Sequence, residues 1–189
     1  MSLERYCVID VETTGFSPAT DRVVEVACAL VDGDCVVGRW EMLVNPGIAI
    51  PPAATAVHGI TDRMVSGAPG VGSALRQVRR FSRGRVVAAH SARFDLSFVG
   101  ATVGAQALCT MRLARALIPE APNHKNQTLR RYLEIDRVAG EEFHPHRALD
   151  DAVVSAHILI ACRRRFRALR SDYSWAEFVR RNALVLAEG

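Results

Sequence analysis

The sequence contains no long hydrophobic run. No apolar segment approaches the roughly 18 residues that a membrane-spanning helix requires, so no membrane association is expected. The N-terminal stretch MSLERYCVID has no apolar core of a signal peptide and runs directly into a predicted strand. With 189 residues, 49% of them hydrophobic, the chain can bury the core of one domain. We therefore expect a cytoplasmic protein in which residues 171–189 form a helix that packs on a domain of residues 1–170.

Closely spaced cysteine pairs are also absent. The five cysteines are odd in number and form no CxxC motif: Cys7, Cys28, Cys35, Cys109 and Cys162. This pattern argues against a disulfide framework and a zinc site, and it favours reduced core thiols.

Lysine is nearly absent as well, because Lys125 is the only one. Nearly all of the 24 basic residues are therefore arginines, and the formal net charge is +4. The arginines cluster in residues 76–85 and 163–170. The planar guanidinium suits phosphate, but each cluster taken alone is more often a solvated helix face. The charge permits a polyanionic partner without establishing one.

The hydrophobic pattern predicts five strands and several helices. A Pro/Gly-rich segment, 45–72, is expected to contain no regular element. Strands that come first, followed by strand–helix alternation, indicate an α/β domain with a mixed sheet. The expected strands are Tyr6–Val11, Val23–Val31, Cys35–Val44, Arg85–His90 and Gln106–Cys109, and the expected helices are Ser73–Arg83, Phe94–Val103, Met111–Ile118, Thr128–Ile135, one from Leu149 onward and Trp175–Leu186.

The first strand carries two acids inside its apolar run. Because strand side chains alternate in direction, Asp10 and Glu12 share a face with Tyr6 and Val8. Two neighbouring carboxylates repel each other unless a cation lies between them, and all-oxygen ligands select magnesium or manganese. Such a pair alone is also consistent with a solvated or arginine-paired end of the strand.

Two further segments place acids where elements begin. Asp95 follows a buried strand at the start of a predicted helix, in AAHSARFDLSFV. HPHRALDDA carries His146, Asp150 and Asp151 into an amphipathic helix. Acids near helix N-termini are common for capping reasons, so neither segment alone indicates a site.

Together these motifs resemble the DEDDh 3′–5′ exonuclease superfamily, which includes proofreading epsilon subunits of bacterial DNA polymerase III. VIDVETTG matches its DxETTG motif, HSARFDLSFV its second motif and HRALDDA its third, in the right order between about Tyr6 and Arg165. VHGIT, 57–61, is similar to the family's loop between the first two motifs. Ser91 replaces the usual asparagine, and Cys109 stands where aspartate is frequent.

The resemblance implies an RNase H-like mixed five-stranded sheet flanked by helices, with the exonuclease domain in residues 1–170. It also implies phosphodiester hydrolysis with two Mg²⁺ or Mn²⁺ ions. Asp10 would bridge both ions, Glu12 and Asp151 would complete one site, and Asp95 would serve the other through water. His146 would be the general base. The implied substrate contacts are Thr13, Thr14, Gly15, His58, Gly59, Ile60, His90 and Phe94.

Several alternatives stay open at this point. Helix geometry alone would place Asp150 nearer His146 (i, i+4), whereas the spacing of the family motif selects Asp151. The partner is nucleic acid with a free 3′ end, DNA being favoured over RNA by the intact ETTG and HGIT. An exoribonuclease of the same fold and a catalytically silent binding module are the rivals. The protein could associate with a polymerase or act alone.

Overall fold

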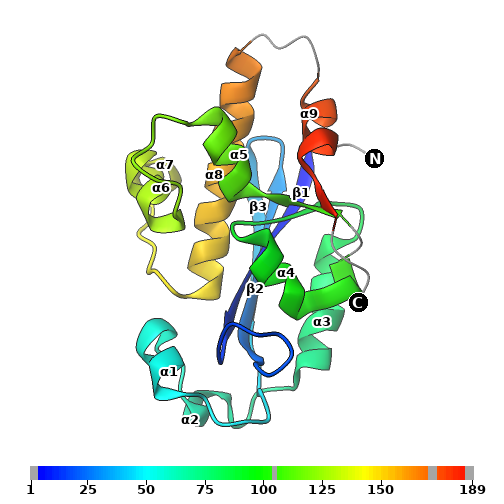
Figure 1. The fold of residues 1–189 in the computed structure, drawn as a ribbon, viewed down its shortest axis with the longest axis vertical. Coiled ribbons are helices and arrows are strands. Elements are labelled where there is room, and N and C mark those ends of the chain that lie inside the picture. Colours follow the sequence, from blue (N-terminus) through cyan, green and yellow to red (C-terminus); the bar gives the residue numbers. More distant parts are fainter. Residues whose placement is uncertain (1–3, 104–105, 170–173, 186–189) are drawn as a thin grey trace.

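The computed structural model describes residues 4–103, 106–169 and 174–185. One mixed sheet forms its centre, in the order β3-β2-β1-β4-β5-β6 (Figure 1). Three antiparallel neighbours open the chain: β1 (Arg5–Thr13), β2 (Val23–Asp32) and β3 (Cys35–Leu43). A tight turn at Gly33 joins β2 to β3, which form the predicted hairpin. β4 (Val86–Ala89) and β5 (Gln106–Cys109) run parallel to β1. The five predicted strands are therefore confirmed, and a two-residue sixth strand joins the edge.

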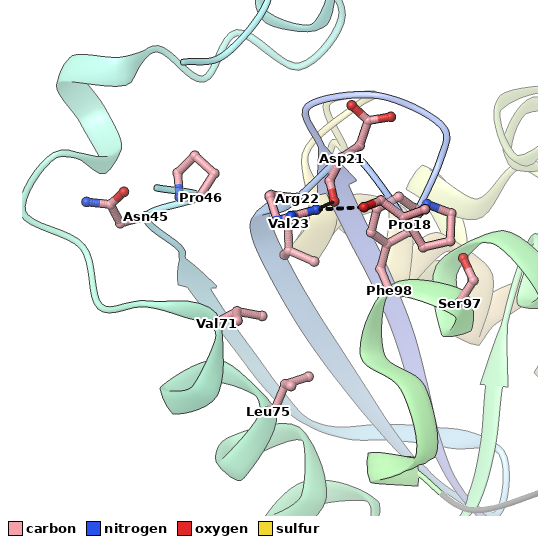
Figure 2. A pocket seen from close by; sticks show the side chains of 11 residues that line it. Pro18, Asp21, Arg22, Val23, Asn45, Pro46, Val71, Leu75, Ser97 and Phe98 are labelled. Carbon is pink, nitrogen blue, oxygen red and sulfur yellow. Dashed lines mark hydrogen bonds between the residues drawn. The ribbon is translucent and has the colours of Figure 1, made fainter. Parts of the chain in front are cut away.

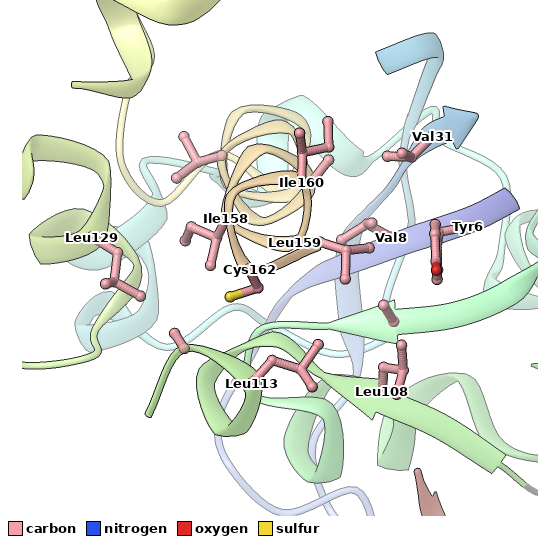
Figure 3. Close-up of a cluster of buried hydrophobic side chains, with 14 of the residues drawn as sticks. Tyr6, Val8, Val31, Leu108, Leu113, Leu129, Ile158, Leu159, Ile160 and Cys162 are labelled. Atoms are coloured by element: carbon pink, nitrogen blue, oxygen red, sulfur yellow. The ribbon is translucent and has the colours of Figure 1, made fainter. Parts of the chain in front are cut away.

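The alternation of β1 separates two hydrophobic cores. Tyr6 and Val8 point to the face covered by α5 (Thr110–Leu117), α6 (Asn126–Tyr132) and the long helix α8 (Ala148–Ala168), as Figure 3 shows. Cys7, Ile9 and Val11 point to the face covered by α3 (Val71–Ser82) and α4 (Ala92–Val99). Asp10 and Glu12 follow Val8 on the α8 side, so the packing of α8 decides which groups the two acids meet.

Segment 45–72 was wrongly predicted to lack regular structure. It contains α1 (Pro52–His58) and α2 (Asp62–Val65). Proline near the start of α1 supplies a helical φ, and Gly59 ends the helix with φ 72°, its N–H donating to the carbonyl oxygen of Thr55. A small core of its own holds the segment against β2: Val24, Ile50, Ile60 and Val65.

The C-terminal helix is shorter than predicted. α9 (Trp175–Asn182) stops before β6 (Leu184–Val185), which pairs antiparallel with β5. Leu184 is buried against the core on the α3 side, so the chain gains both burial and sheet pairing by leaving the helix. The predicted end at Leu186 lies outside the described residues. Trp175 donates from Nε1 to the Tyr6 hydroxyl at 2.5 Å and makes an edge-to-face contact with Phe166 of α8.

Short elements and single residues complete the fold. A 3₁₀ turn, η1 (Gly100–Val103), ends the segment predicted as one helix, and α7 (Ile135–Ala139) was not predicted. The cysteines form no disulfide, and Cys35 differs from the predicted core thiols in being exposed. Within the described part of the chain, no helix has both the length and the apolar character needed to cross a membrane.

Candidate active site

The site begins where β1 extends past its parallel neighbour. β4 pairs with β1 only as far as Val8, so the β1 edge beyond that residue is open on that side. Asp10 and Glu12 lie on this extension, half-buried and one strand repeat apart. β2 continues to pair with them on the other side, opposite Ala27 and Glu25. The end of β1 is therefore rigid but accessible, which suits a site that must hold two charges.

Asp95 comes to this open edge from α4. The chain leaves β4 through His90 and Ser91, and Asp95 lies in the first turn of the helix that follows. Its carboxylate accepts the Ser91 N–H at 3.1 Å and interacts with the backbone of Val11, between the two acids of β1. Asp95 is 4% exposed. Three carboxylates from two elements thus meet at one end of the sheet.

Asp151 supplies the fourth carboxylate from the first turns of α8. Its Oδ1 accepts Gln127 Nε2 at 2.7 Å, and its Oδ2 accepts the backbone N–H of His146 at 2.8 Å. Asn126 donates to the Asp151 carbonyl oxygen and to Ser155 Oγ, which fixes the start of α6 to this turn. Both carboxylate oxygens are therefore oriented by groups of the protein.

His146 precedes α8 in a strained conformation. Its φ is +60°, in the left-handed region that side chains other than glycine rarely adopt. The imidazole is exposed, and one of its nitrogens lies within 4.8 Å of ligand atoms of both Glu12 and Asp151. Backbone strain of this kind persists where the surrounding contacts enforce it, and here the bond to Asp151 is one of them. The imidazole is thereby directed to the carboxylates.

Asp150 points away from this cluster. Its Oδ2 accepts the His144 backbone N–H at 2.7 Å and lies 3.4 Å from His144 Nδ1. The i, i+4 spacing that favoured Asp150 does not apply, because His146 precedes helix α8. Asp150 shapes the loop, whereas Asp151 faces Glu12.

We predict that Asp151→Asn reduces the exonuclease activity implied by the family resemblance far more than Asp150→Asn does. The amide removes a charge from the carboxylate cluster in the first variant and only from a loop contact in the second. Initial rates on a 5′-labelled oligonucleotide, with melting temperatures as a check on folding, compare the two. A larger loss for Asp150→Asn would show that the site uses the other aspartate.

Burial and mutual repulsion raise the pKa of all four carboxyl groups. Burial is the main cause in each case and raises the pKa of Glu12 to about 8 and that of Asp95 to about 7. The pKa of Asp10 lies well above its usual value because of burial and then the charges of Asp95, Asp151 and Glu12. The pKa of Asp151 is raised by burial and lowered again by its bonds to His146 and Gln127. A cluster that resists ionisation in this way is suited to a cation.

The donor atoms fit a divalent metal. Among the described residues, Glu12, His146 and Asp151 each offer a ligand atom, all within 4.8 Å of one another. Asp10 and Asp95 add carboxylates beside this group. Carboxylate oxygens are the ligands of hard cations, so the arrangement can hold a metal ion without a change of fold.

We predict that the melting temperature of the metal-free protein falls as the pH rises from about 4 to about 8. The folded pKa values of Glu12 and Asp95, about 8 and about 7, lie above the roughly 4 expected for the unfolded chain, so their contribution is complete below about pH 4 and is lost progressively until they ionise in the folded protein. Metal binding requires the ionised form and should raise the melting temperature more at high pH than at low pH. Thermal melts in EDTA and in excess Mg²⁺ or Mn²⁺ measure both trends. A metal effect independent of pH would contradict this account.

The TTG turn is held by its own hydrogen bonds. The Thr14 N–H donates to the Arg22 carbonyl oxygen at 2.8 Å, and the Thr13 hydroxyl donates to the Gly15 carbonyl oxygen. A Cβ at Gly15 would lie 2.6 Å from the Asp21 carboxylate, so a larger residue there would displace that carboxylate. The Thr14 N–H is therefore engaged within the protein rather than free for a ligand.

The two histidines predicted to contact substrate differ in how their ring nitrogens are bonded. The His58 Nδ1 accepts the Ile60 N–H at 3.0 Å, while its buried Nε2 has no well-formed hydrogen bond within the described residues. His90 Nε2 donates to the His124 carbonyl oxygen and Nδ1 accepts the Thr110 hydroxyl, each at 2.9 Å. Burial lowers the pKa of His90 to about 4. His90 therefore has no free ring nitrogen for a ligand, and these bonds give no support to its predicted substrate contact.

An aromatic row flanks the site. Phe94, half-buried, lies 6.1 Å from the ring of Phe16 and 5.2 Å from that of Phe98. Phe16 is 90% exposed, directly after the TTG turn. Phe94 was predicted from the sequence and Phe16 was not, although Phe16 directly follows the TTG motif. Phe98 also lines a cavity of about 310 Å³ between the loop 18–23, α3 and α4 (Figure 2).

Sequence reasoning also missed Glu25. This residue is 1% exposed and pairs across the strands with Glu12. Its carboxylate accepts Arg147 Nη2 and the Ala148 N–H, each at 2.9 Å. It thus caps α8 and anchors the two residues that follow His146, while Asp151 holds His146 itself. An acid in the middle of the apolar run VVEVACALV was the signal.

The sequence of this chain is similar to those of known proteins. The exonuclease family model, RNase T, matches residues 7–159. The DNA polymerase III PolC-type protein of Caldanaerobacter subterraneus subsp. tengcongensis is 35% identical over 167 residues, covering 84% of this chain and 12% of that protein. The DNA polymerase III subunit epsilon-like protein of Rhodobacter capsulatus is 37% identical over 165 residues, covering 82% of this chain and 23% of that protein. The chain therefore spans a small part of these relatives' length.

The fold of one solved structure matches that of nearly the whole chain. Exonuclease X in complex with 5′ overhanging duplex DNA is 28% identical, with a TM-score of 0.75, and the match covers 93% of this chain and 98% of that one. The family match includes the first, second and third motifs in order. The chain belongs to the exonuclease family, as its resemblance to the DEDDh enzymes indicated.

Proposed function

We propose that this chain is a 3′–5′ exonuclease that hydrolyses phosphodiester bonds at the 3′ end of nucleic acid. The observation that carries the proposal is the convergence of Asp10, Glu12, Asp95 and Asp151 from three elements, each with a raised pKa. Such a cluster is costly for stability, and holding cations accounts for it. We assign this activity to the domain of residues 1–170.

Each residue has a proposed role in that reaction. Asp10, Glu12 and Asp151 hold Mg²⁺ or Mn²⁺ at the end of β1, and Asp95 acts from the α4 side. Two such ions, when bound, stabilise the attacking and leaving oxygens of an in-line displacement. Glu25 and Gln127 position the loop and the Asp151 carboxylate, respectively.

His146 is the proposed general base. Its exposed imidazole lies at the edge of the carboxylate cluster, where it can accept a proton from the attacking water. Its strained backbone and the bond from its backbone N–H to Asp151 hold the residue beside the cluster.

The substrate contacts belong to the same proposal. Thr13, Thr14 and Gly15 shape the turn beside the terminal nucleotide, and the loop of His58, Gly59 and Ile60 faces it from α1. The aromatic row offers faces on which bases can stack. His90 is left out, because both of its nitrogens are bonded within the protein.

DNA is the favoured substrate. The motifs ETTG and HGIT are both intact, and the two curated relatives are named as DNA polymerase III proteins. The same names support a polymerase-associated role in the cytoplasm, and a stand-alone nuclease is the alternative. An exoribonuclease of this fold is the second candidate, and a silent binding module is disfavoured because all five motif residues are present.

Matched DNA and RNA oligonucleotides labelled at the 5′ end test the proposal. We expect a ladder that shortens from the 3′ end in Mg²⁺ or Mn²⁺ and disappears in EDTA. Faster shortening of RNA would select the exoribonuclease. Tight binding with no shortening of either strand would select the silent module.

A further inference from the structure

The two arginine clusters of the sequence differ in their ion pairing. In α8, Arg163, Arg164 and Arg167 pair with Glu4 and Asp34, and Arg165 pairs with Glu120. In α3 and directly after it, four exposed arginines have no acidic group within ion-pair distance in the described part of the chain: Arg76, Arg79, Arg80 and Arg83. We call these four the α3 arginine face. Its charge is available to a ligand, whereas the four α8 arginines above are engaged in ion pairs.

The α3 arginine face places like charges close together. Arg76 and Arg80 lie four residues apart in the helix, where like charges repel each other, and Arg83 follows the helix as its C-cap residue. The opposite face of α3 is buried through Ala74 and Val78, so the arginines project away from the sheet. They line a hollow of about 690 Å³ with Ser82 and Val103. A concave basic surface on a well-packed helix is suited to an anionic partner.

Helix α3, which carries the α3 arginine face, and α4, which carries Asp95, cover the same face of the sheet. The aromatic row leads from Phe16 to Phe98, and Phe98 lines the cavity of Figure 2 together with Arg22 and Leu75. Leu75 is followed on α3 by Arg76, the first residue of the arginine face. Asp21, an acid in the cavity wall, is directed to the Ser17 N–H and the Thr14 hydroxyl. A strand leaving the carboxylates along this path meets aromatic faces first and arginines next.

We infer that the α3 arginine face binds the phosphate backbone of the substrate strand upstream of its 3′ end. This inference rests on the proposed function and adds the direction in which the strand runs. A basic groove with aromatic stacking positions is how single strands are bound without sequence preference, and the guanidinium matches phosphate geometry. The partner is therefore single-stranded nucleic acid rather than a duplex groove.

The test compares two triple variants of equal charge change. Arg76→Gln/Arg79→Gln/Arg80→Gln removes three charges from the α3 arginine face, and Arg164→Gln/Arg165→Gln/Arg167→Gln removes three from the paired cluster. Both are made in an Asp10→Ala chain, so that a labelled 20-residue strand is not degraded. Fluorescence anisotropy in Mg²⁺ measures affinity over a range of salt, and thermal melts confirm folding.

We expect the α3 variant to bind at least about tenfold more weakly near physiological salt. The slope of log affinity against log salt concentration should fall in magnitude by about 2 for three lost phosphate contacts. The α8 variant should retain the parent affinity and slope. Equal affinities for parent and α3 variant, or equal losses in both variants, would overturn the inference and leave an acidic protein as the partner of this face. Failure of the wild-type chain to cleave would instead count against the proposed function alone.

Discussion

Asp10→Ala should abolish cleavage while leaving the fold intact. Asp10 lies in the middle of the four carboxyl groups, and its own pKa is raised by burial and by all of its acidic neighbours. Removal of this group takes away the proposed ligand shared between the ions. The loss should exceed the roughly 10–100-fold effect of altering a residue that only supports a metal ligand.

The metal-free Asp10→Asn protein should melt at a higher temperature than the wild type at pH 8. The amide keeps the shape of the side chain and removes one of the mutually repelling charges. The increase in melting temperature caused by Mg²⁺ or Mn²⁺ should shrink in the same variant. Oligonucleotide cleavage and melts with and without metal measure these effects. Full activity of Asp10→Ala would refute the assignment of the site.

His146→Ala should slow cleavage by about 10²–10⁴-fold, the usual contribution of a general base. The carboxylates remain, so the metal-induced rise in melting temperature should persist. The ring is exposed, and its loss removes no buried contact. The expected result is therefore a lower rate with near-normal stability.

His144→Ala is the matched control for that experiment. This histidine is exposed, lies in the same loop and contacts Asp150 rather than the carboxylate cluster. Single-turnover rates on a 5′-labelled DNA strand compare the two variants. Equal rates for His146→Ala and the wild type would exclude His146 as the base, whereas a large loss for His144→Ala alone would move that role to the neighbouring histidine.

The sequence by itself determined the five main strands and the identity of the acids. Strand alternation placed Asp10 and Glu12 on one face, and the resemblance to the DEDDh family, carried by the order of the motifs, pointed to Asp95, His146 and Asp151. Strand periodicity and the residues within each motif are local signals. The same local rules misjudged segment 45–72 and the end of the last helix, where burial against β2 and β5 decides the conformation.

Only the tertiary structure decided the contacts between distant residues. It directed Asp151 rather than Asp150 to Glu12, because His146 precedes α8 in a left-handed conformation that no helical wheel includes. It assigned His90 to the fold through Thr110 and His124. It also paired Arg163, Arg164 and Arg167 with Glu4 and Asp34, more than a hundred residues away, and left the α3 arginine face exposed. Charge pairing and burial depend on which segments meet in space, and one-dimensional spacing does not contain that information.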